Sequence, residues 1–301
     1  MLQYSLYNLY SEKSLNYIIF KIEFKILNIK YLTIILYTMQ TDYINATIIS
    51  DSESDNEEVI VTPKKIKKPR ILQQPLQKFY KEDANIFEIG VDEAGRGPLF
   101  GRVYTAAVIL PKDDTFDHSR VKDSKKFHSK KKIEEVAEYI KANAIAWYVS
   151  FEDEKVIDDI NILQATQKAM HNSILETRKQ IINKMKENNT ENYNIELLID
   201  GNYFNPITIL NKKTAKIESI PYITIEGGDN KYTAIAAASI LAKVERDKYI
   251  DELCQQNPTL AEYYGIDSNK GYGAKRHLDG IKEHGITIWH RRSFGICKSY
   301  V

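Results

Sequence analysis

Hydrophobic residues in the middle of the chain fall into short runs that end at turn-forming residues. Ile86, Ile89 and Val91 belong to one β run, and residues 103–110 form a second run of β formers. The glycine- and proline-containing stretch at 95–98 must interrupt the first strand before the second begins. The pattern predicts a β-hairpin with a wide connection.

Apolar spacing along the rest of the chain predicts helices that alternate with strands. Three- and four-residue spacings indicate helices, and short apolar runs bounded by turn residues indicate strands. The predicted helices cover 131–143, 157–185 (as one helix or two), 232–249 and 275–284, and the further strands cover 144–151, 195–199 and 222–226. We therefore expect one folded α/β domain over residues 85–301.

Two adjacent carboxylates, Asp92 and Glu93, stand where the first strand should end. Neighbouring carboxylates repel each other unless a positive group is bound, and hard cations such as Mg²⁺ take oxygen ligands. The alternative is a solvated turn, in which Asp and Glu are common. The next residues favour the metal, because Gly95 and Gly97 allow a ligand close to the backbone amides and Arg96 adds a positive charge. Together these features indicate phosphoryl-transfer chemistry.

Further carboxylates follow the later strands. Asp200 ends the run at 195–199, and adjacent strands that finish on the same edge would bring it beside Asp92 and Glu93. Asp229 precedes the alanine-rich helix, where an Asp is commonly an ordinary N-cap. Asp247, one helix length later, is the alternative for a fourth carboxylate.

A polar stretch and a glycine-flanked tyrosine are candidate substrate contacts. Ser124 and Lys125 lie at the entrance to the predicted helix 131–143, where they could contact a phosphate; an ordinary solvated lysine run is the alternative. Tyr272 lies between two glycines in a lysine-flanked turn, and such an aromatic can stack on a sugar or base. The alternative is a tyrosine that covers the core.

Residues 1–84 are interpreted as a leader. Residues 1–38 hold no apolar run near the roughly 20 residues of a membrane span and no small-residue cleavage site. We interpret Met39 as the translation start, which peptides upstream of it would contradict. The acidic stretch 51–58 and the basic stretch 63–70 are predicted to be disordered, the latter as a nuclear import signal or a nucleic-acid tether.

A short motif at 73–80 resembles the box that docks replication proteins onto a sliding clamp. Gln73, Leu76, Phe79 and Tyr80 match the spacing Q-x-x-L-x-x-F-Y. One helical turn would place the apolar side chains on a single face with Gln73 in a side pocket. The alternative is that the aromatic residues pack under the first strand of the domain.

Composition limits the class of protein. The 301 residues are 43% hydrophobic and carry a net charge of +1, so any surface for a polyanion must be local. The two cysteines and six histidines lack zinc-site spacing. We expect an intracellular, cytoplasmic monomer that binds no membrane, with the nucleus or a viral factory as further locations.

The motifs together resemble those of ribonuclease HII, a type 2 ribonuclease H family. They follow the family's order and cover residues 86–296, and the leader and AT-biased residue usage indicate a large DNA virus or a protist as the source. The matching segments are GVDEAGRGPLFG at 90–101, DSKK at 123–126, NILQAT at 161–166, LLIDGN at 197–202, GGDNKYTAIAAASILAKVERD at 227–247, KGYGAKRHL at 270–278 and HRRSF at 290–294.

The resemblance implies a ribonuclease H-like fold, with a mixed five-stranded sheet, flanking helices and a helical C-terminal extension. It implies Mn²⁺ or Mg²⁺ as cofactor, with one ion activating water and a second stabilising the leaving 3′-oxygen. The implied catalytic residues and metal ligands are Asp92, Glu93, Asp200 and Asp229. The resemblance therefore favours Asp229 over Asp247 as the fourth carboxylate. The implied substrate contacts are Gly95, Arg96 and Gly97 at the ribose 2′-hydroxyl and Tyr272 on the neighbouring sugar, in addition to the candidates Ser124 and Lys125.

The implied activity is hydrolysis of the RNA strand of RNA–DNA hybrids and incision 5′ of single ribonucleotides in duplex DNA. The products would carry 3′-hydroxyl and 5′-phosphate ends. Two residues depart from the family pattern: Arg102 replaces a proline, which we expect to alter only the turn, and Ala274 replaces a hydroxyl residue. The rival functions are the sister ribonuclease HIII, which lacks the Gly-Arg-Gly triplet and the tyrosine turn, and an inactive clamp-bound adaptor that only binds hybrids.

Overall fold

A computed structural model describes residues 75–190, 192–211 and 215–300 of the chain. The predictions for the start at Met39, the acidic stretch 51–58, the basic stretch 63–70 and Gln73 lie outside the described residues. In the described residues, no helix is both long and apolar enough to cross a membrane.

A mixed five-stranded sheet forms the centre of the domain, in the order β3-β2-β1-β4-β7. β1 pairs antiparallel with β2 and parallel with β4, which confirms the predicted hairpin and the predicted mixed sheet. β2 also pairs antiparallel with β3, and β4 pairs parallel with β7. The strands are β1 (Ile86–Ala94), β2 (Val103–Ile109), β3 (Ala146–Glu152), β4 (Asn194–Asp200) and β7 (Tyr222–Ile225).

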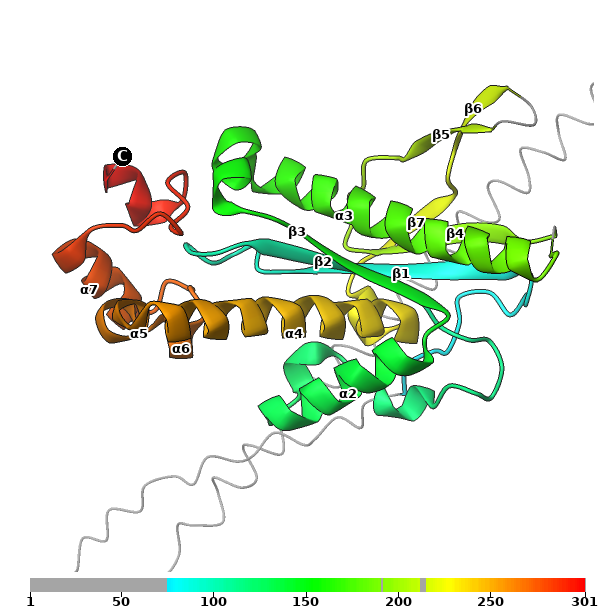
Figure 1. Ribbon diagram of the computed structural model, residues 1–301, viewed down its shortest axis with the longest axis horizontal. Helices are drawn as coiled ribbons and strands as arrows, with labels where there is room; N and C mark the ends of the chain where they lie inside the picture. The colour runs from blue at the N-terminus through cyan, green and yellow to red at the C-terminus, as the bar shows by residue number, and fades with distance from the viewer. Residues whose placement is uncertain (1–74, 191, 212–214, 301) are drawn as a thin grey trace, which may run out of the picture. The chain divides into compact units, whose positions relative to one another are not determined.

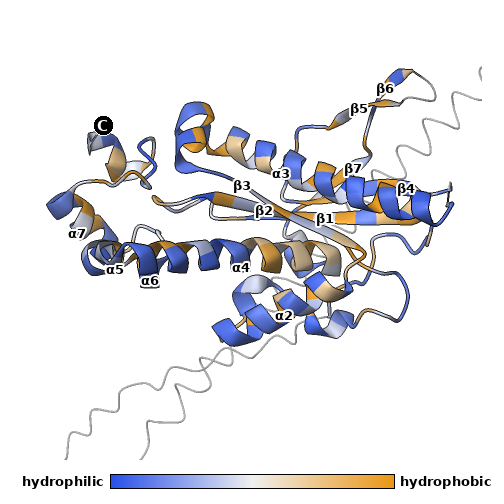
Figure 2. Ribbon diagram, in the orientation of Figure 1, coloured by the Kyte–Doolittle hydropathy of each residue, from blue (hydrophilic) through white to orange (hydrophobic). Residues whose placement is uncertain are grey.

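Helices cover both faces of this sheet, as Figure 1 shows. On one face lies α3 (Glu154–Glu187), and on the other lies α4 (Thr233–Gln256), with α2 (Lys130–Asn143) packed against it. Successive residues of β2 alternate between the two layers: Ala106 and Val108 belong to the core under α4, whereas Ala107 and Ile109 belong to the core under α3. This alternation is the two-residue period of a strand that is buried on both faces. Figure 2 shows the apolar positions gathered along these strands and on the adjoining half of α4.

α4 lies unusually close to β1 because β1 has a glycine in the contact. A Cβ atom at Gly90 would lie 2.2 Å from the backbone carbonyl carbon of Ala234, far inside van der Waals contact. Only a residue without a side chain fits there. Because side chains alternate along a strand, Asp92 faces the same way as Gly90 and is therefore directed at α4.

α3 is a single assignment of 34 residues, but its backbone is interrupted at Asn161, whose φ is 67°. The Asp153 side chain caps its start by accepting a hydrogen bond from the Val156 amide at 2.9 Å. The prediction of one helix or two over 157–185 is thus met by two helical segments joined at a kink.

The C-terminal part packs at one end of the sheet and surrounds a separate apolar cluster that includes Phe100, Ile250, Tyr264 and Cys297. The helix predicted at 275–284 is confirmed, and α4 extends seven residues beyond the predicted end at 249. The helical elements here are α5 (Pro258–Tyr264), α6 (Ile266–Asn269), α7 (Lys275–His284) and the 3₁₀ turn η4 (Gly295–Tyr300). Three further 3₁₀ turns are η1 (His118–Arg120), η2 (Ser124–Lys126) and η3 (Gly228–Asn230).

A two-stranded ribbon, β5 (Thr208–Asn211) with β6 (Lys216–Ser219), was not predicted. Its strands have four residues each, and Leu210 and Ile217 are directly paired yet 62% and 75% exposed. Since β6 is exposed throughout and only Ile209 of β5 packs on the core, the strands leave little periodic signal in the sequence.

The segment before β1 lies against the domain. Residues 75–80 form no helical turn; Gln77 instead makes a β-bridge with Tyr232. Phe79 packs edge-on against His118, and Tyr80 against Tyr232. The one-turn helix predicted for the clamp box is therefore wrong for residues 75–80. The alternative, in which the aromatic residues pack on the domain, is confirmed for Phe79 and Tyr80. The sliding-clamp contact itself stays a prediction.

Candidate active site

Strand pairing brings the predicted carboxylates to one end of the sheet. The parallel register of β1 and β4 pairs Val91 with Ile199, so the next residues, Asp92 and Asp200, lie on neighbouring strands at the same level. β1 continues to Ala94, so Asp92 and Glu93 belong to the last three residues of the strand and do not follow it. Ile199 and Val91 are both fully buried, so the strand ends are fixed from below by the core.

Asp92 is a buried carboxylate, 5% exposed. It accepts hydrogen bonds from the Glu93 amide, at 2.7 Å, and from the hydroxyl of Ser239 on α4. Burial, followed by the nearby charges of Glu93 and Asp200, raises the pKa of Asp92 well above its ordinary value. The two hydrogen bonds only partly oppose this shift, so a nearby cation would further stabilise the charged form of Asp92.

The pKa values of Glu93 and Asp200 are raised for the same main reason, which is burial. Burial raises the pKa of Glu93, although Arg96 opposes the shift through an ion pair of 3.3 Å between Nη1 and Oε1. Burial also raises the pKa of Asp200, where the Gly228 amide opposes it by donating to Oδ1 at 2.7 Å. In three neighbouring carboxylates, burial thus disfavours the charged form, which a further positive charge would stabilise.

The turn η3 places Asp229 beside Asp200. Asp229 is 3% exposed, and its charge acts on Asp200. Its Oδ2 lies 3.4 Å from the Nζ of Lys125. The helix α4 has Tyr232 as its N-cap, so the ordinary N-cap alternative for Asp229 is wrong.

Asp247, the alternative for the fourth carboxylate, is placed elsewhere. It pairs with Lys243 of α4 at 2.8 Å. Asp247 and Asp229 are separated by most of the length of α4, which rises about 1.5 Å per residue. The structure therefore groups Asp229, and not Asp247, with Asp200.

The carboxylate cluster fits a divalent cation by its chemistry. All four side chains offer oxygen, the ligand that hard cations such as Mg²⁺ and Mn²⁺ take. As the side chains stand, however, no three His, Cys, Asp or Glu groups among the described residues converge into a ready coordination shell. Glu93 and Asp229 are instead turned to Arg96 and Lys125. A bound cation would therefore have to displace these two pairs.

The glycine-rich loop and Tyr272 meet beside the carboxylates. A Cβ atom at Gly97 would lie 3.5 Å from Cε1 of the Tyr272 ring, and Tyr272 is 52% exposed. Sequence reasoning placed both features on turns, and the structure brings them into contact across 175 residues of chain. Tyr272 does not cover the core, so that alternative is wrong.

A buried arginine supports this contact and was missed by sequence reasoning. Arg246 is 3% exposed and lies 5.9 Å from the Tyr272 ring centre. A Cβ atom at Gly95, whose φ is +91°, would lie 2.2 Å from Arg246 Nε. Gly95 is thus required both by its backbone conformation and by the arginine beneath it.

Ser124 reaches the carboxylates through Ser239. The two hydroxyl oxygens are 3.0 Å apart and both residues are buried. Since Ser239 donates to Asp92, Ser124 must donate to Ser239. Ser239 was also missed, because one serine in an alanine-rich helix carries no signal of its own.

Arg102 does more than alter the turn. Its guanidinium lies between the rings of Phe151 and Tyr249, at 4.1 and 4.3 Å from their centres. The expectation of a local effect was wrong because the partners lie on β3 and α4, which sequence spacing does not relate to residue 102.

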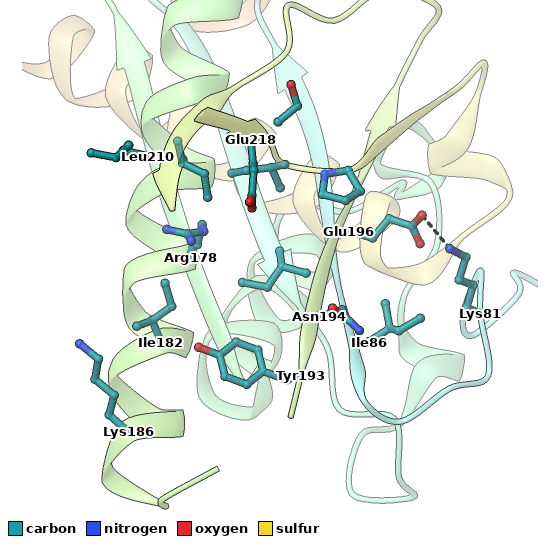
Figure 3. Close-up of a pocket in the computed structure, with 15 residues that line it drawn as sticks. Lys81, Ile86, Arg178, Ile182, Lys186, Tyr193, Asn194, Glu196, Leu210 and Glu218 are labelled. Atoms are coloured by element: carbon teal, nitrogen blue, oxygen red, sulfur yellow. Dashed lines mark hydrogen bonds and ion pairs between the residues drawn. The ribbon is translucent and has the colours of Figure 1, made fainter. Parts of the chain in front are cut away.

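Figure 3 shows a pocket of about 980 Å³ that none of the four carboxylates lines. Its walls come from α3, from the β5–β6 ribbon and from the first half of β4. Lys81, which precedes β1, forms an ion pair with Glu196 of β4 at its edge. Asp200 ends the same strand six residues after Asn194, which is about 20 Å at the usual strand rise. The pocket therefore takes no part in the carboxylate site.

Comparisons with known proteins identify the family. The family model described as ribonuclease HII matches residues 89–297. A ribonuclease HII of Bacteroides thetaiotaomicron is 42% identical over 214 residues, which cover 70% of this chain and 91% of the relative. A ribonuclease HII of Neisseria meningitidis serogroup C is 40% identical over 212 residues, which cover 70% of this chain and 93% of the relative.

Solved structures agree in fold. The ribonuclease H2 of Pyrococcus horikoshii OT3 matches with a TM-score of 0.51 at 21% identity, covering 71% of this chain and 96% of that one. Bst-RNase HIII in complex with Mn²⁺ also matches with a TM-score of 0.51, at 19% identity, covering 72% of this chain and 70% of that one. The sheet, its helices and the sequence motifs lead to one conclusion: the chain belongs to the ribonuclease HII family, whose enzymes are endoribonucleases that hydrolyse the RNA strand of RNA–DNA hybrids.

Proposed function

We propose that this enzyme incises duplex DNA on the 5′ side of a single ribonucleotide, in addition to cleaving longer RNA–DNA hybrids, and leaves 3′-hydroxyl and 5′-phosphate ends. The observation that carries the proposal is the contact between the Gly95–Gly97 loop and Tyr272 beside the carboxylates. Backbone amides aimed at a ribose hydroxyl select RNA at one position without regard to the base. Recognition of this kind requires one ribonucleotide and not a run of ribonucleotides.

Asp92, Glu93, Asp200 and Asp229 would hold the divalent ions, Mn²⁺ or Mg²⁺, in this proposal. When bound, these ions supply an activated water and stabilise the leaving 3′-oxygen. The raised pKa of Asp92, Glu93 and Asp200 supports this role, because each carboxylate gains most from a nearby positive charge. The Mn²⁺ named for the structural neighbour Bst-RNase HIII is in keeping with it.

Lys125 and Arg96 have a second role in this proposal. Each now pairs with a carboxylate and each is well exposed, at 79% and 47% of the side chain. Only the cations of these pairs are exposed, whereas Asp229 and Glu93 are largely buried, so each carboxylate needs another positive charge once its cation leaves, and a bound divalent ion would supply it. Lys125 and Arg96 can therefore release Asp229 and Glu93 and turn to the phosphates of the substrate.

The test is cleavage of three labelled duplexes by the purified enzyme with Mn²⁺ or Mg²⁺. One duplex is DNA with a single ribonucleotide, one is an RNA–DNA hybrid and one is all DNA. We expect incision 5′ of the single ribonucleotide, none in all-DNA, and a loss of at least about 100-fold in Asp200→Asn, since a metal-ligating carboxylate is removed.

The control is Asp247→Asn, which removes a carboxylate of the same type that pairs with Lys243 outside the cluster. It should keep activity within about twofold. Cleavage of the hybrid alone would indicate the specificity of ribonuclease HIII, and binding without any cleavage would indicate the adaptor.

A further inference from the structure

A single buried arginine holds the glycine-rich loop from behind. Arg291 has no exposed surface and donates to four backbone carbonyl oxygens of the loop. The acceptors are Gly95 at 2.6 Å, Arg96 at 3.0 Å, Pro98 at 2.9 Å and Gly101 at 2.8 Å. Among the described residues, no carboxylate lies within ion-pair distance of Arg291, so these carbonyl groups, together with the more distant charges of Glu154 and Asp158, stabilise its buried charge.

The carbonyl contacts determine where the loop amides point. A peptide group is planar and trans, so its N–H points away from its C=O. The carbonyls of Gly95 and Arg96 are turned to Arg291, which directs the N–H groups of Arg96 and Gly97 away from it. These are the amides that the proposed function assigns to the ribose hydroxyl.

His290, the residue before Arg291, is connected to Tyr272, the second part of the proposed ribose-binding site. His290 and His277 are 1% and 0% exposed, and their Nε2 atoms are 3.1 Å apart. The Thr287 amide donates to His290 Nδ1 at 2.9 Å, so His290 must carry its proton on Nε2 and donate it to His277. His277 then carries its proton on Nδ1 and donates to the Tyr272 carbonyl at 2.9 Å. The chain of bonds has one consistent direction, from Thr287 to Tyr272.

Both histidines are neutral in this arrangement. Burial and the neighbouring His277 lower the pKa of His290 to about 3, and burial lowers the pKa of His277. Backbone contacts tie the same segment to the loop again: Gly101 N donates to the Trp289 carbonyl, and Arg291 N donates to the Leu99 carbonyl.

We propose that residues 287–291, here called the clasp, are a positioning device for ribose recognition: Arg291 orients the amides of the Gly95–Gly97 loop, and the His290–His277 chain holds Tyr272 against that loop. The clasp touches no substrate. This inference rests on the proposed function, because it names the residues that position the proposed ribose-binding site.

The test measures the preference for a ribonucleotide separately from binding as such. The full chain carrying Asp200→Asn, which prevents cleavage, is titrated with a fluorescent DNA duplex holding one ribonucleotide and with its all-DNA twin. The readout is the ratio of the two dissociation constants. Arg291→Lys should reduce this ratio about tenfold, because a lysine cannot donate in a fork to four separate carbonyls.

The matched control is Arg292→Lys, the next residue, whose side chain is exposed. It should leave the ratio unchanged. A folded Arg291→Lys protein with an unchanged ratio, or an equal loss in both variants, would overturn the proposal. If the parent protein itself shows no preference for the ribonucleotide, the proposed function fails rather than the clasp.

A second arm covers the case in which Arg291→Lys does not fold. His290→Phe removes the donor to His277 and should weaken binding of both duplexes about tenfold, because Tyr272 is released. His290→Gln keeps an amide that can donate and accept, and should restore binding to within about threefold. Equal binding by both variants would contradict the histidine chain, and circular dichroism confirms that each variant is folded.

Discussion

At the scale of single residues, the site depends on how each buried charge is compensated. Asp92 is 5% exposed and faces two other carboxylates, yet it has a hydroxyl partner in Ser239. Ser124 extends this contact to the segment that carries Lys125. One neutral hydroxyl thus connects the first carboxylate to the predicted phosphate contacts.

Ser239→Ala should lower metal affinity and activity while leaving the fold intact. A hydrogen bond to a charged group contributes about 1.5–3 kcal/mol, so we expect a loss in kcat/KM of about tenfold or more. Its loss also raises the pKa of Asp92 further, since the serine now lowers it. The measurement is kcat/KM against Mn²⁺ concentration, where the curve should move to higher concentration.

Ser150→Ala is the comparison for that variant. Ser150 is a buried serine on β3 that accepts a hydrogen bond from Asn172 at 2.8 Å. It should lower thermal stability to a similar degree and leave the Mn²⁺ curve in place. The same shift in both variants would mean that Ser239 acts only through stability.

At the scale of elements, most helices and strands follow from local patterns, and the exceptions have a physical cause. The helix at 275–284 appears with its predicted bounds because its apolar face is regular and a glycine follows it. α4 runs past 249 to Gln256, where its contacts with the C-terminal cluster continue. The β5–β6 ribbon was missed because β6 is exposed throughout and Ile209 of β5 is only partly buried against the core.

The start of α7 lacks a side-chain cap, because Ala274 is its N-cap residue. The backbone of Ala274 is in the β region, with φ −67° and ψ 156°, which suits a capping residue. Ala274→Thr should therefore stabilise the protein by about 1 kcal/mol and raise Tm by roughly 2–4 °C. It should also lower KM if the hydroxyl reaches a substrate phosphate.

Ala274→Val separates the hydroxyl from the added volume, because valine has the shape of threonine without its oxygen. Thermal unfolding of both variants gives the comparison. A similar rise in Tm for Val and Thr would show that capping is not the cause.

At the scale of the whole molecule, the fold assembles a site that costs stability. Burial and mutual repulsion raise the pKa of Asp92, Glu93 and Asp200, so the folded protein holds protons that the unfolded chain has released. The unfolded reference values are about 4. Between pH 4 and the raised values, these three carboxylates therefore lower stability as pH rises, whereas the neutral His290 and His277 make it rise up to about pH 6.5, the ordinary pKa of a histidine.

We expect the difference in unfolding free energy between the wild type and Asp92→Asn, measured in EDTA, to shift against the wild type from pH 4 upward, because the histidine contribution is common to both proteins. Each unit by which a folded pKa exceeds the unfolded one corresponds to about 1.4 kcal/mol at pH values above both. Mn²⁺ should restore stability, and more so at higher pH, because it competes with the protons. Denaturant unfolding at a series of pH values, with and without Mn²⁺, is the measurement.

Asp92→Asn should flatten that pH dependence and be more stable than the wild type at neutral pH in EDTA. Asp247→Asn should not, because Asp247 has the partner Lys243. A stability difference between the wild type and Asp92→Asn that stays constant from pH 4 upward would contradict the raised pKa of Asp92.

The sequence by itself determined the features that are local. The strand that ends in Asp92 and Glu93, the glycines after it, and the tyrosine between two glycines are each visible within a few residues. Alternation and helical spacing report which side of an element is buried, and this was enough to place the five strands of the central sheet and the helices α2, α3, α4 and α7 along the chain. The motifs also carried the family resemblance.

Only the tertiary structure decided which residues meet. The pairing of Asp229 with Lys125, the support of Asp92 by Ser239, and the hold of Arg291 on the loop join segments 104 to 196 residues apart. Neither spacing nor residue type names such partners, because a buried polar group is satisfied by whatever the packed fold brings to it. Arg291 illustrates this best: in the sequence it is one of two adjacent arginines, and only its burial separates it from the exposed Arg292.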